Sequence, residues 1–180
     1  MKRVMAICGG GFRKNLNKNT IMILLITEGI MLRKLLIKYI EVDGFDATDK
    51  ILEVMRKESI ELIISGSIPI AGFNLINAKR IFDEKGIPSI FILEKEPDME
   101  AVKRALMKHF EDWRRRLAIL EEVKIQRVQT LKGEIILGTF GIDLEESIRI
   151  IESITIFGKT PEPLRLARML AKSITKFIKT

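Results

Sequence analysis

The chain has 180 residues, of which 47% are hydrophobic, 31% charged and 6% aromatic. This length and apolar content exclude a disordered chain and predict one domain over residues 1–180 with a buried core. With one Cys and one His, an intramolecular disulfide is excluded and a conventional zinc site is not expected. The apolar runs are short and interrupted by charges, so the sequence predicts neither a membrane span nor a signal peptide. We therefore expect a cytoplasmic protein without a membrane partner.

The positive charge is concentrated at the two ends of the chain. The net charge is +7; residues 1–40 hold eight Lys and Arg against one Glu, and residues 161–180 hold five against one. Such basic segments can contact the phosphates of a nucleic acid. We predict nucleic acid as a partner, DNA or RNA, with Arg13, Lys14 and Lys18 on its phosphates. The alternative is that these cations are ordinary solvated side chains.

Three apolar runs at the start of the chain predict strands, and helices and strands follow in alternation. The expected strands are residues 2–8, 20–27, 30–42, 60–65, 88–93 and 134–138, with a helix as the alternative at 30–42. The expected helices are residues 46–55, 74–84, 98–123 and 143–155, with a last helix that begins at Pro161. Residues 98–123 predict a charged helical insertion that is bent or broken near Trp113.

The order of these elements predicts the topology of the sheet. Consecutive strands joined by tight turns pair antiparallel, and a strand that follows a helical crossover is parallel. The predicted fold class is therefore α/β, with a mixed sheet of three antiparallel strands followed by parallel strands, and helices on both faces. This arrangement resembles the ribonuclease H-like fold. In that fold, carboxylates from the first strand, the start of the first helix and the fourth strand meet at one sheet edge and hold divalent metal.

Four segments carry a family resemblance that covers most of the chain. They are VMAICGGGF (4–12), VDGFDAT (42–48), ISGSIPIAGFNLIN (64–77) and PEPLRLARMLA (161–171). In this order they resemble the archaeal domain-of-unknown-function family 99, whose members resemble endonuclease V and are also described as deoxyuridine endonucleases. The resemblance implies a ribonuclease H-like fold and metal-dependent cleavage of DNA or RNA next to deaminated bases, as in DNA repair. The 30 Ile and only two Gln residues are typical of a thermophilic source.

The resemblance also implies a metal site, whose best remaining ligand is Asp46, with Asp43 as the near alternative. These carboxylates would hold magnesium or manganese and would activate the water that attacks the phosphate. Their alternative roles are purely structural. Asp46 would then cap the helix that follows, and Asp43 would shape the turn with Gly44.

Other positions of the family's site carry different residues in this chain. Cys8 and Gly9 replace two carboxylates of the first strand, Ser65 replaces an Asp at the end of the fourth strand, and Phe140 replaces a functional His of endonuclease V. A thiol is a poor ligand for magnesium, which prefers oxygen. The sequence therefore leaves two hypotheses. One is an endonuclease with a degraded metal site, and the other is an inactive relative that binds nucleic acid or a protein partner.

Four further residues are candidates for lining a nucleic-acid groove. Gly10 and Gly66 would let a nucleic-acid backbone approach closely. Phe73 would stack on a base and Asn74 would form a hydrogen bond to it. Close packing between segments of the chain itself is the alternative.

Some features have two interpretations that the sequence does not separate. Cys8 is either a nucleophile or a buried, inert thiol. Arg114–Arg116 beside Trp113 either bind phosphate or form a solvated face. A homodimer is compatible with the sequence, and residues 98–123 would then be a lid, a dimer arm or a binding surface.

Overall fold

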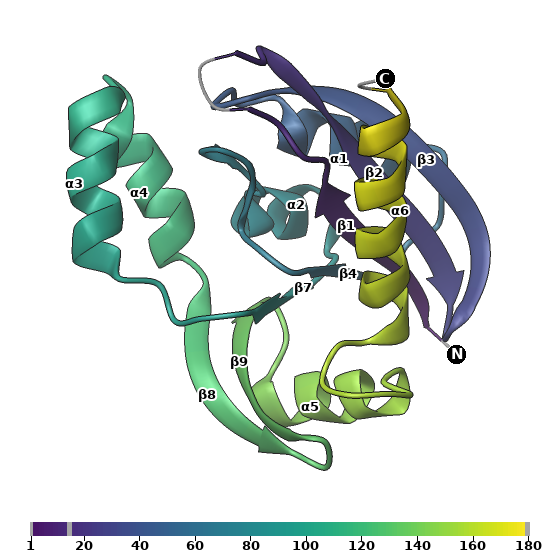
Figure 1. Cartoon of the computed structure of the whole chain (residues 1–180). Coiled ribbons are helices and arrows are strands. Elements are labelled where there is room, and N and C mark those ends of the chain that lie inside the picture. The colour runs from purple at the N-terminus through teal and green to yellow at the C-terminus, as the bar shows by residue number, and fades with distance from the viewer. Residues whose placement is uncertain (1, 14–15, 179–180) are drawn as a thin grey trace.

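The computed structural model describes residues 2–13 and 16–178, and its elements are labelled in Figure 1. The strands are β1 (Arg3–Gly9), β2 (Asn19–Glu28), β3 (Met31–Glu41), β4 (Leu62–Ser65), β5 (Pro69–Ala71), β6 (Asn74–Leu75), β7 (Ser89–Leu93), β8 (Lys124–Thr130) and β9 (Gly133–Phe140). The helices are α1 (Ala47–Met55), α2 (Ala78–Lys85), α3 (Met99–His109), α4 (Trp113–Glu121), α5 (Leu144–Ser153) and α6 (Glu162–Ile178). In this part of the chain, no helix is long and apolar enough to cross a membrane.

Seven of the strands form one mixed sheet in the order β3-β2-β1-β4-β7-β9-β8. The first three strands pair antiparallel, with Ile7 opposite Leu24 and Leu24 opposite Leu36. β4 is parallel to β1, and β7 is parallel to β4, because α1 and α2 return the chain to the starting edge of the sheet. The predicted mixed sheet is confirmed. β5 and β6 pair with each other in a separate small hairpin.

The last strands of the sheet differ from the prediction. β9 pairs antiparallel with β7, whereas the sequence analysis predicts that every strand after a helix is parallel. The cause is β8, a strand that the sequence analysis does not predict and that pairs with β9 as a hairpin. In β8 only Val128 and Thr130 are buried, so this edge strand lacks the apolar run by which strands are recognised.

Two predicted helices also have different bounds. α2 begins at Ala78, later than predicted, because Asn74 and Leu75 pair as β6. The helix predicted at 98–123 is two helices, α3 and α4, which confirms the break predicted near Trp113. We call this pair the α3–α4 hairpin.

The two faces of the sheet are covered by different helices. Along β1, Met5 and Ile7 belong to the core that includes residues of α1 and α2, whereas Ala6 belongs to the core with α6. Figure 1 shows α6 lying across β1 and β2 on one face, with α1 and α2 behind the sheet. Because side chains alternate along a strand, Cys8 is on the same face as Ala6 and α6.

A buried arginine attaches the α3–α4 hairpin to the rest of the structure. Arg116 of α4 is only 5% exposed, and its Nη1 donates to the carbonyl oxygens of Gly44 (3.0 Å) and Phe73 (2.6 Å). Its guanidinium also lies 4.6 Å from the ring centre of Phe45 and 4.3 Å from that of Phe110. Arg116 therefore connects two loops with α4, and is neither a solvated side chain nor free to bind phosphate.

Candidate functional site

A cavity of about 720 Å³ opens where three strands of the sheet end. Gly9, Ser65 and Leu93, the last residues of β1, β4 and β7, all line it. Its walls are largely apolar and come mainly from the segment after β4 and from the α3–α4 hairpin, as with Ile68 and Val102. We call it the edge cavity, and it lies at the sheet edge where the sequence predicts the site.

The charged side chains that line the edge cavity are Glu94, Lys95 and Arg168, two cations and one carboxylate. Arg168 comes from α6 and packs against Gly66, just after β4. A Cβ atom on Gly66 would lie 2.3 Å from Nη2 of Arg168, so the guanidinium fills the space that a side chain would need. Glu94 is a distant partner, because its Oε1 lies 3.8 Å from Nη2 of Arg168 and its side chain is 83% exposed.

Cys8 lies at the end of β1 and is half-buried in the wall of the edge cavity. Burial raises the pKa of the Cys8 thiol above its ordinary value, and the positive charge of Arg168 partly opposes this shift. The thiol therefore stays protonated at neutral pH. This favours the interpretation of Cys8 as an inert thiol over that of a nucleophile.

The raised pKa predicts slow alkylation of Cys8. Only the thiolate reacts with iodoacetamide, so at neutral pH we expect slower labelling than that of cysteine in a short peptide, with a pH midpoint shifted upward. In Arg168→Met the opposing positive charge is lost, and the midpoint should rise further. Mass spectrometry of the labelled protein against pH measures both values. A midpoint at or below that of the peptide would contradict this description of the cavity wall.

Ser65 ends β4 and takes part in the backbone structure of the sheet. The residue is fully buried, and its Oγ lies 2.8 Å from the carbonyl oxygen of Ser67 and 3.3 Å from that of Ile7. The backbone N–H of Ser67 also points to this Oγ, at 3.4 Å. The hydroxyl therefore connects β4 with β1 and with the loop that follows β4.

These residues do not fit a magnesium or manganese ion at the edge cavity. Both ions prefer oxygen ligands with negative charge, whereas the strand ends offer a thiol, a hydroxyl engaged with backbone carbonyls, and a glycine beside a guanidinium. Within residues 2–13 and 16–178, no group of three or more His, Cys, Asp or Glu side chains could hold a metal ion. A fixed positive charge beside Gly66 would also repel a cation.

The two candidate metal ligands, Asp43 and Asp46, lie in the loop between β3 and α1 and are not among the residues that line the edge cavity. Asp43 adopts a positive φ of 60°, and its Oδ1 accepts a hydrogen bond from the backbone N–H of Phe73 at 2.7 Å. Asp46 occupies the N-cap position of α1 without a side-chain capping bond, and its Oδ1 accepts from the N–H of Glu41 at 3.1 Å. Both carboxylates therefore stabilise the loop.

Asn74 is at the centre of this loop's hydrogen-bond network. It is fully buried, and its Nδ2 donates to the carbonyl oxygen of Glu41 (2.8 Å) and to Oδ1 of Asp46 (2.7 Å). Its Oδ1 accepts from the N–H of Ala47 at 3.1 Å, at the start of α1. The amide is thus engaged within the chain, which supports the packing interpretation of Asn74 over a contact with a base.

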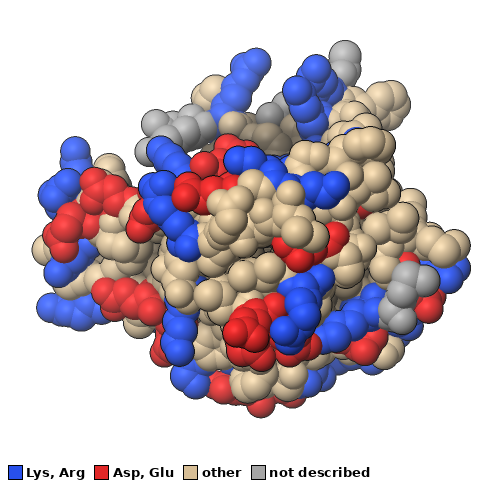
Figure 2. Space-filling model, turned by 90° about the horizontal axis from the view of Figure 1, so that it is seen from below, with Lys and Arg blue, Asp and Glu red and all other residues tan. Residues whose placement is uncertain are grey.

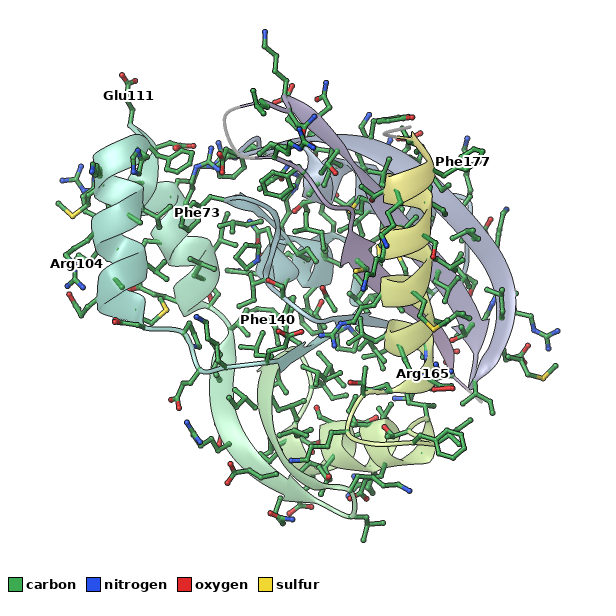
Figure 3. The ribbon with its side chains drawn as sticks, in the orientation of Figure 1. Phe73, Arg104, Glu111, Phe140, Arg165 and Phe177 are labelled. Atoms are coloured by element: carbon green, nitrogen blue, oxygen red, sulfur yellow. The ribbon has the colours of Figure 1, made fainter. Side chains whose placement is uncertain are left out.

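Phe73 and Asn74 are neighbours, but only Phe73 lines the edge cavity. Figure 3 shows Phe73 between the β5–β6 hairpin and the α3–α4 hairpin, where it packs edge-on against Phe110 with ring centres 5.5 Å apart. Its position is compatible with the predicted stacking on a base. Phe140 lies elsewhere: it pairs with Ser89 at the start of β7, at the opposite edge of the sheet, and is drawn apart from Phe73 in Figure 3.

The remaining candidates lie at the end of β1 and in the loop between β1 and β2. Gly9 and Gly10 pass close to other segments, since a Cβ atom would lie 2.0 Å from the carbonyl oxygen of Ile70 at Gly9 and 2.6 Å from Oγ1 of Thr175 at Gly10. Close packing thus explains both glycines. Arg13 and Lys18 are exposed on this loop, and Lys14 lies outside the described residues.

Sequence reasoning did not select Arg168, although it lies within the PEPLRLARMLA segment. The apolar pattern of α6 nevertheless gave a signal for Arg168. In α6, Leu164, Ala167 and Ala171 are buried, and Arg168 is four residues after Leu164, on the edge of that apolar face. An arginine at such a position lies at the boundary between the buried and the exposed faces of the helix.

The fold is shared with solved endonuclease V structures. The enzyme from Bacillus subtilis matches with a TM-score of 0.64 at 12% identity, covering 99% of this chain and 83% of the other. The enzyme from Ciona intestinalis matches with a TM-score of 0.61 at 10% identity, covering 98% and 87%. The fold therefore defines a ribonuclease H-like protein with the architecture of endonuclease V.

Other similarities define a narrower group than this fold class. A protein of unknown function from Archaeoglobus fulgidus has a TM-score of 0.84 at 28% identity, covering 97% of this chain and 98% of the other. The UPF0215 protein of Thermococcus gammatolerans is 34% identical over 140 residues, 76% of this chain and 71% of the relative. The model of the family described as endonuclease dU matches residues 1–175, and the chain belongs to this family. The predicted family resemblance is confirmed.

Proposed function

We propose that this protein binds nucleic acid at the edge cavity and does not cleave it by metal-dependent chemistry. The observation that carries the proposal is the replacement of the expected acidic ligands. At the strand ends stand Cys8, Ser65 and Gly66, the guanidinium of Arg168 lies against Gly66, and the charged lining consists of two cations and one carboxylate. An edge with this charge attracts a phosphate and repels the metal ion that would activate water.

The relatives support nucleic acid as the partner. The Ciona intestinalis endonuclease V was crystallised with a 24mer DNA that contains an inosine followed by a ribo-adenosine. The family's description as endonuclease dU refers to deoxyuridine, another product of base deamination. We infer that single-stranded or locally opened DNA or RNA is the ligand class, because the edge cavity is enclosed on one side by the α3–α4 hairpin.

The distribution of charge on the surface fits a few local contacts with a nucleic acid rather than contact along an extended basic patch. In Figure 2, Lys and Arg side chains are interspersed with Asp and Glu at the left and along the lower part of the face shown, the centre is largely uncharged, and blue side chains project along its upper edge. Arg13 and Lys18 on the β1–β2 loop are exposed and available for phosphate contacts. A few such contacts would make binding moderately sensitive to salt.

Incubation with DNA that contains deoxyuridine or inosine tests the proposal. With magnesium or manganese present, we expect a retarded complex in native gels but no new fragments in denaturing gels. The alternative hypothesis is metal-dependent cleavage with Asp46 and Asp43 as ligands. It predicts DNA fragments that the Asp46→Asn variant no longer produces. If the unmodified protein produces such fragments and a still-folded Asp46→Asn variant does not, the protein cleaves with a metal ion despite its missing carboxylates, and the proposal is wrong.

A protein-binding module is the second candidate, and the exposed face of β3 favours it. β3 is an edge strand, and Leu35, Ile37 and Tyr39 point to one face with exposed fractions of 37%, 43% and 63%. Apolar side chains grouped on an edge strand are typical of association surfaces. A stable dimer that shows no retarded complex in the experiment above would favour this candidate.

A further inference from the structure

We propose that the guanidinium of Arg168 takes the place of the metal ion and binds a phosphate group of the ligand directly. This inference rests on the proposed function and assigns the phosphate contact within the edge cavity. The edge that holds a cation in metal-dependent relatives of this fold would here hold an anion. Arg168 would be its principal ligand and Lys95 a second cation.

The position of Arg168 is set by two elements. Its helix, α6, packs against β1 and β2, which places the side chain over the strand ends. At Gly66 a Cβ atom would lie 2.3 Å from Nη2 and 3.1 Å from both Cζ and Nε. The whole guanidinium therefore lies against the backbone just after β4. No larger residue fits at position 66 without moving the guanidinium.

The charge of Arg168 is weakly compensated. Its ion pair with Glu94 has a long separation of 3.8 Å, and the Glu94 carboxylate is 83% exposed to water. Ion pairs of this kind contribute little and are easily exchanged. The Arg168 side chain is itself 32% exposed, so a ligand can reach it from the cavity. A phosphate could thus replace Glu94 at small cost.

The chemistry of the cavity indicates a nucleotide rather than a bare anion. Guanidinium donates two parallel hydrogen bonds to phosphate oxygens, which gives a geometry that an ammonium group cannot supply. Phe73, Ile68 and Leu120 line the same cavity and would provide apolar walls for the attached nucleoside. A volume of about 720 Å³ lies within the range of small-molecule sites. Either a free nucleoside monophosphate or one nucleotide of a strand would satisfy these contacts.

The test measures binding in EDTA, so that no divalent cation contributes. The probes are inorganic phosphate, uridine monophosphate and a short fluorescein-labelled single-stranded oligodeoxynucleotide. We expect Arg168→Met to weaken the binding of uridine monophosphate by about tenfold or more, as for the loss of one charged bidentate contact. Arg165→Met is the matched control, since Arg165 lies one turn earlier on α6 and pairs with Glu162. It should bind as the unmodified protein does.

Protection of Cys8 gives a second readout, because Cys8 and Arg168 line the same cavity. Uridine monophosphate should slow the alkylation of Cys8 in the unmodified protein and in Arg165→Met, but not in Arg168→Met. Equal affinity of Arg168→Met and the unmodified protein for uridine monophosphate would overturn the assignment, as would binding that requires magnesium. If the oligonucleotide binds equally to both and protects Cys8 in both, the assignment falls and the proposed function stands. If uridine monophosphate binds through Arg168 but the oligonucleotide does not bind, the proposed function falls instead.

Discussion

Replacement of Asn74 by Ala should lower the free energy of unfolding by roughly 3–5 kcal/mol, the sum expected for the three hydrogen bonds of a buried amide, one of them to a carboxylate. Asn74 is fully buried and connects Glu41 at the end of β3, Asp46 in the loop, and Ala47 at the start of α1. Without its amide, the N–H of Ala47 loses its partner in a buried position, and the Asp46 carboxylate keeps only the hydrogen bond from the N–H of Glu41. Urea unfolding followed by circular dichroism measures the loss.

Two further variants separate this network from a general effect of substitution. Asn19 is exposed at the start of β2, so Asn19→Ala should change the stability by well under about 1 kcal/mol. Asn74→Asp would place a second carboxylate 2.7 Å from Oδ1 of Asp46. We expect it to be strongly destabilised at neutral pH and to recover partly in acid, where a protonated carboxyl can donate again. Wild-type stability of Asn74→Ala would show that Asp46 and the start of α1 are not held by this network.

Replacement of Arg116 by Met should also be costly, by roughly 2–4 kcal/mol, because it removes a buried, hydrogen-bonded charge. The carbonyl oxygens of Gly44 and Phe73 would both lose their donor, and Met cannot restore it although it fills a similar volume. The α3–α4 hairpin would lose its polar connection to the loop before α1. Urea unfolding measures the stability, and hydrogen exchange should show increased opening of α4.

The matched control for Arg116 lies two residues earlier in the same helix. Arg114 is exposed and its guanidinium stacks on Trp113 at 4.7 Å from the ring centre. Arg114→Met should therefore cost less than about 1 kcal/mol. If the two variants are equally stable, the contacts of Arg116 contribute nothing beyond those of a surface arginine.

The fold could be predicted from the sequence wherever the apolar pattern reflects burial. β1, β2, β4 and β7 consist largely of buried residues, and their runs were recognisable. β8 could not be recognised, because it is an edge strand with mostly exposed side chains. The pairing of β9 was wrong for the same reason. Because β8 was not recognised, the reversal of chain direction between β8 and β9 was missed, and β9 was expected to be parallel.

The site was predictable only in part. The positions of Cys8 and Ser65 at the strand ends follow from the strand boundaries, and both line the predicted edge. Arg168 is separated from them by more than half of the chain, and only the packing of α6 across β1 brings them together. The spacing of residues in the sequence does not predict a contact between segments that are so far apart. The engagement of Asp43 and Asp46 with the β5–β6 hairpin was likewise not visible, since this hairpin had no strand-like pattern.

A fold can keep its geometry while the chemistry of its site changes. Here the fold of endonuclease V is shared, while the charged side chains at the strand ends are two cations and one carboxylate. The guanidinium of Arg168, which comes from α6, lies against Gly66 just after β4. The phosphate contact proposed above would give the cavity a role without the carboxylates.

Magnesium dependence of oligonucleotide binding tests this account most directly. The fluorescence anisotropy of a labelled single-stranded oligodeoxynucleotide is followed with the protein, first in EDTA and then with increasing magnesium. We predict binding in EDTA that weakens slightly as magnesium is added, because the added cation competes with Arg and Lys for the phosphates. Binding that appears only with magnesium, and that is lost in Asp46→Asn, would contradict the account and support a functional metal site.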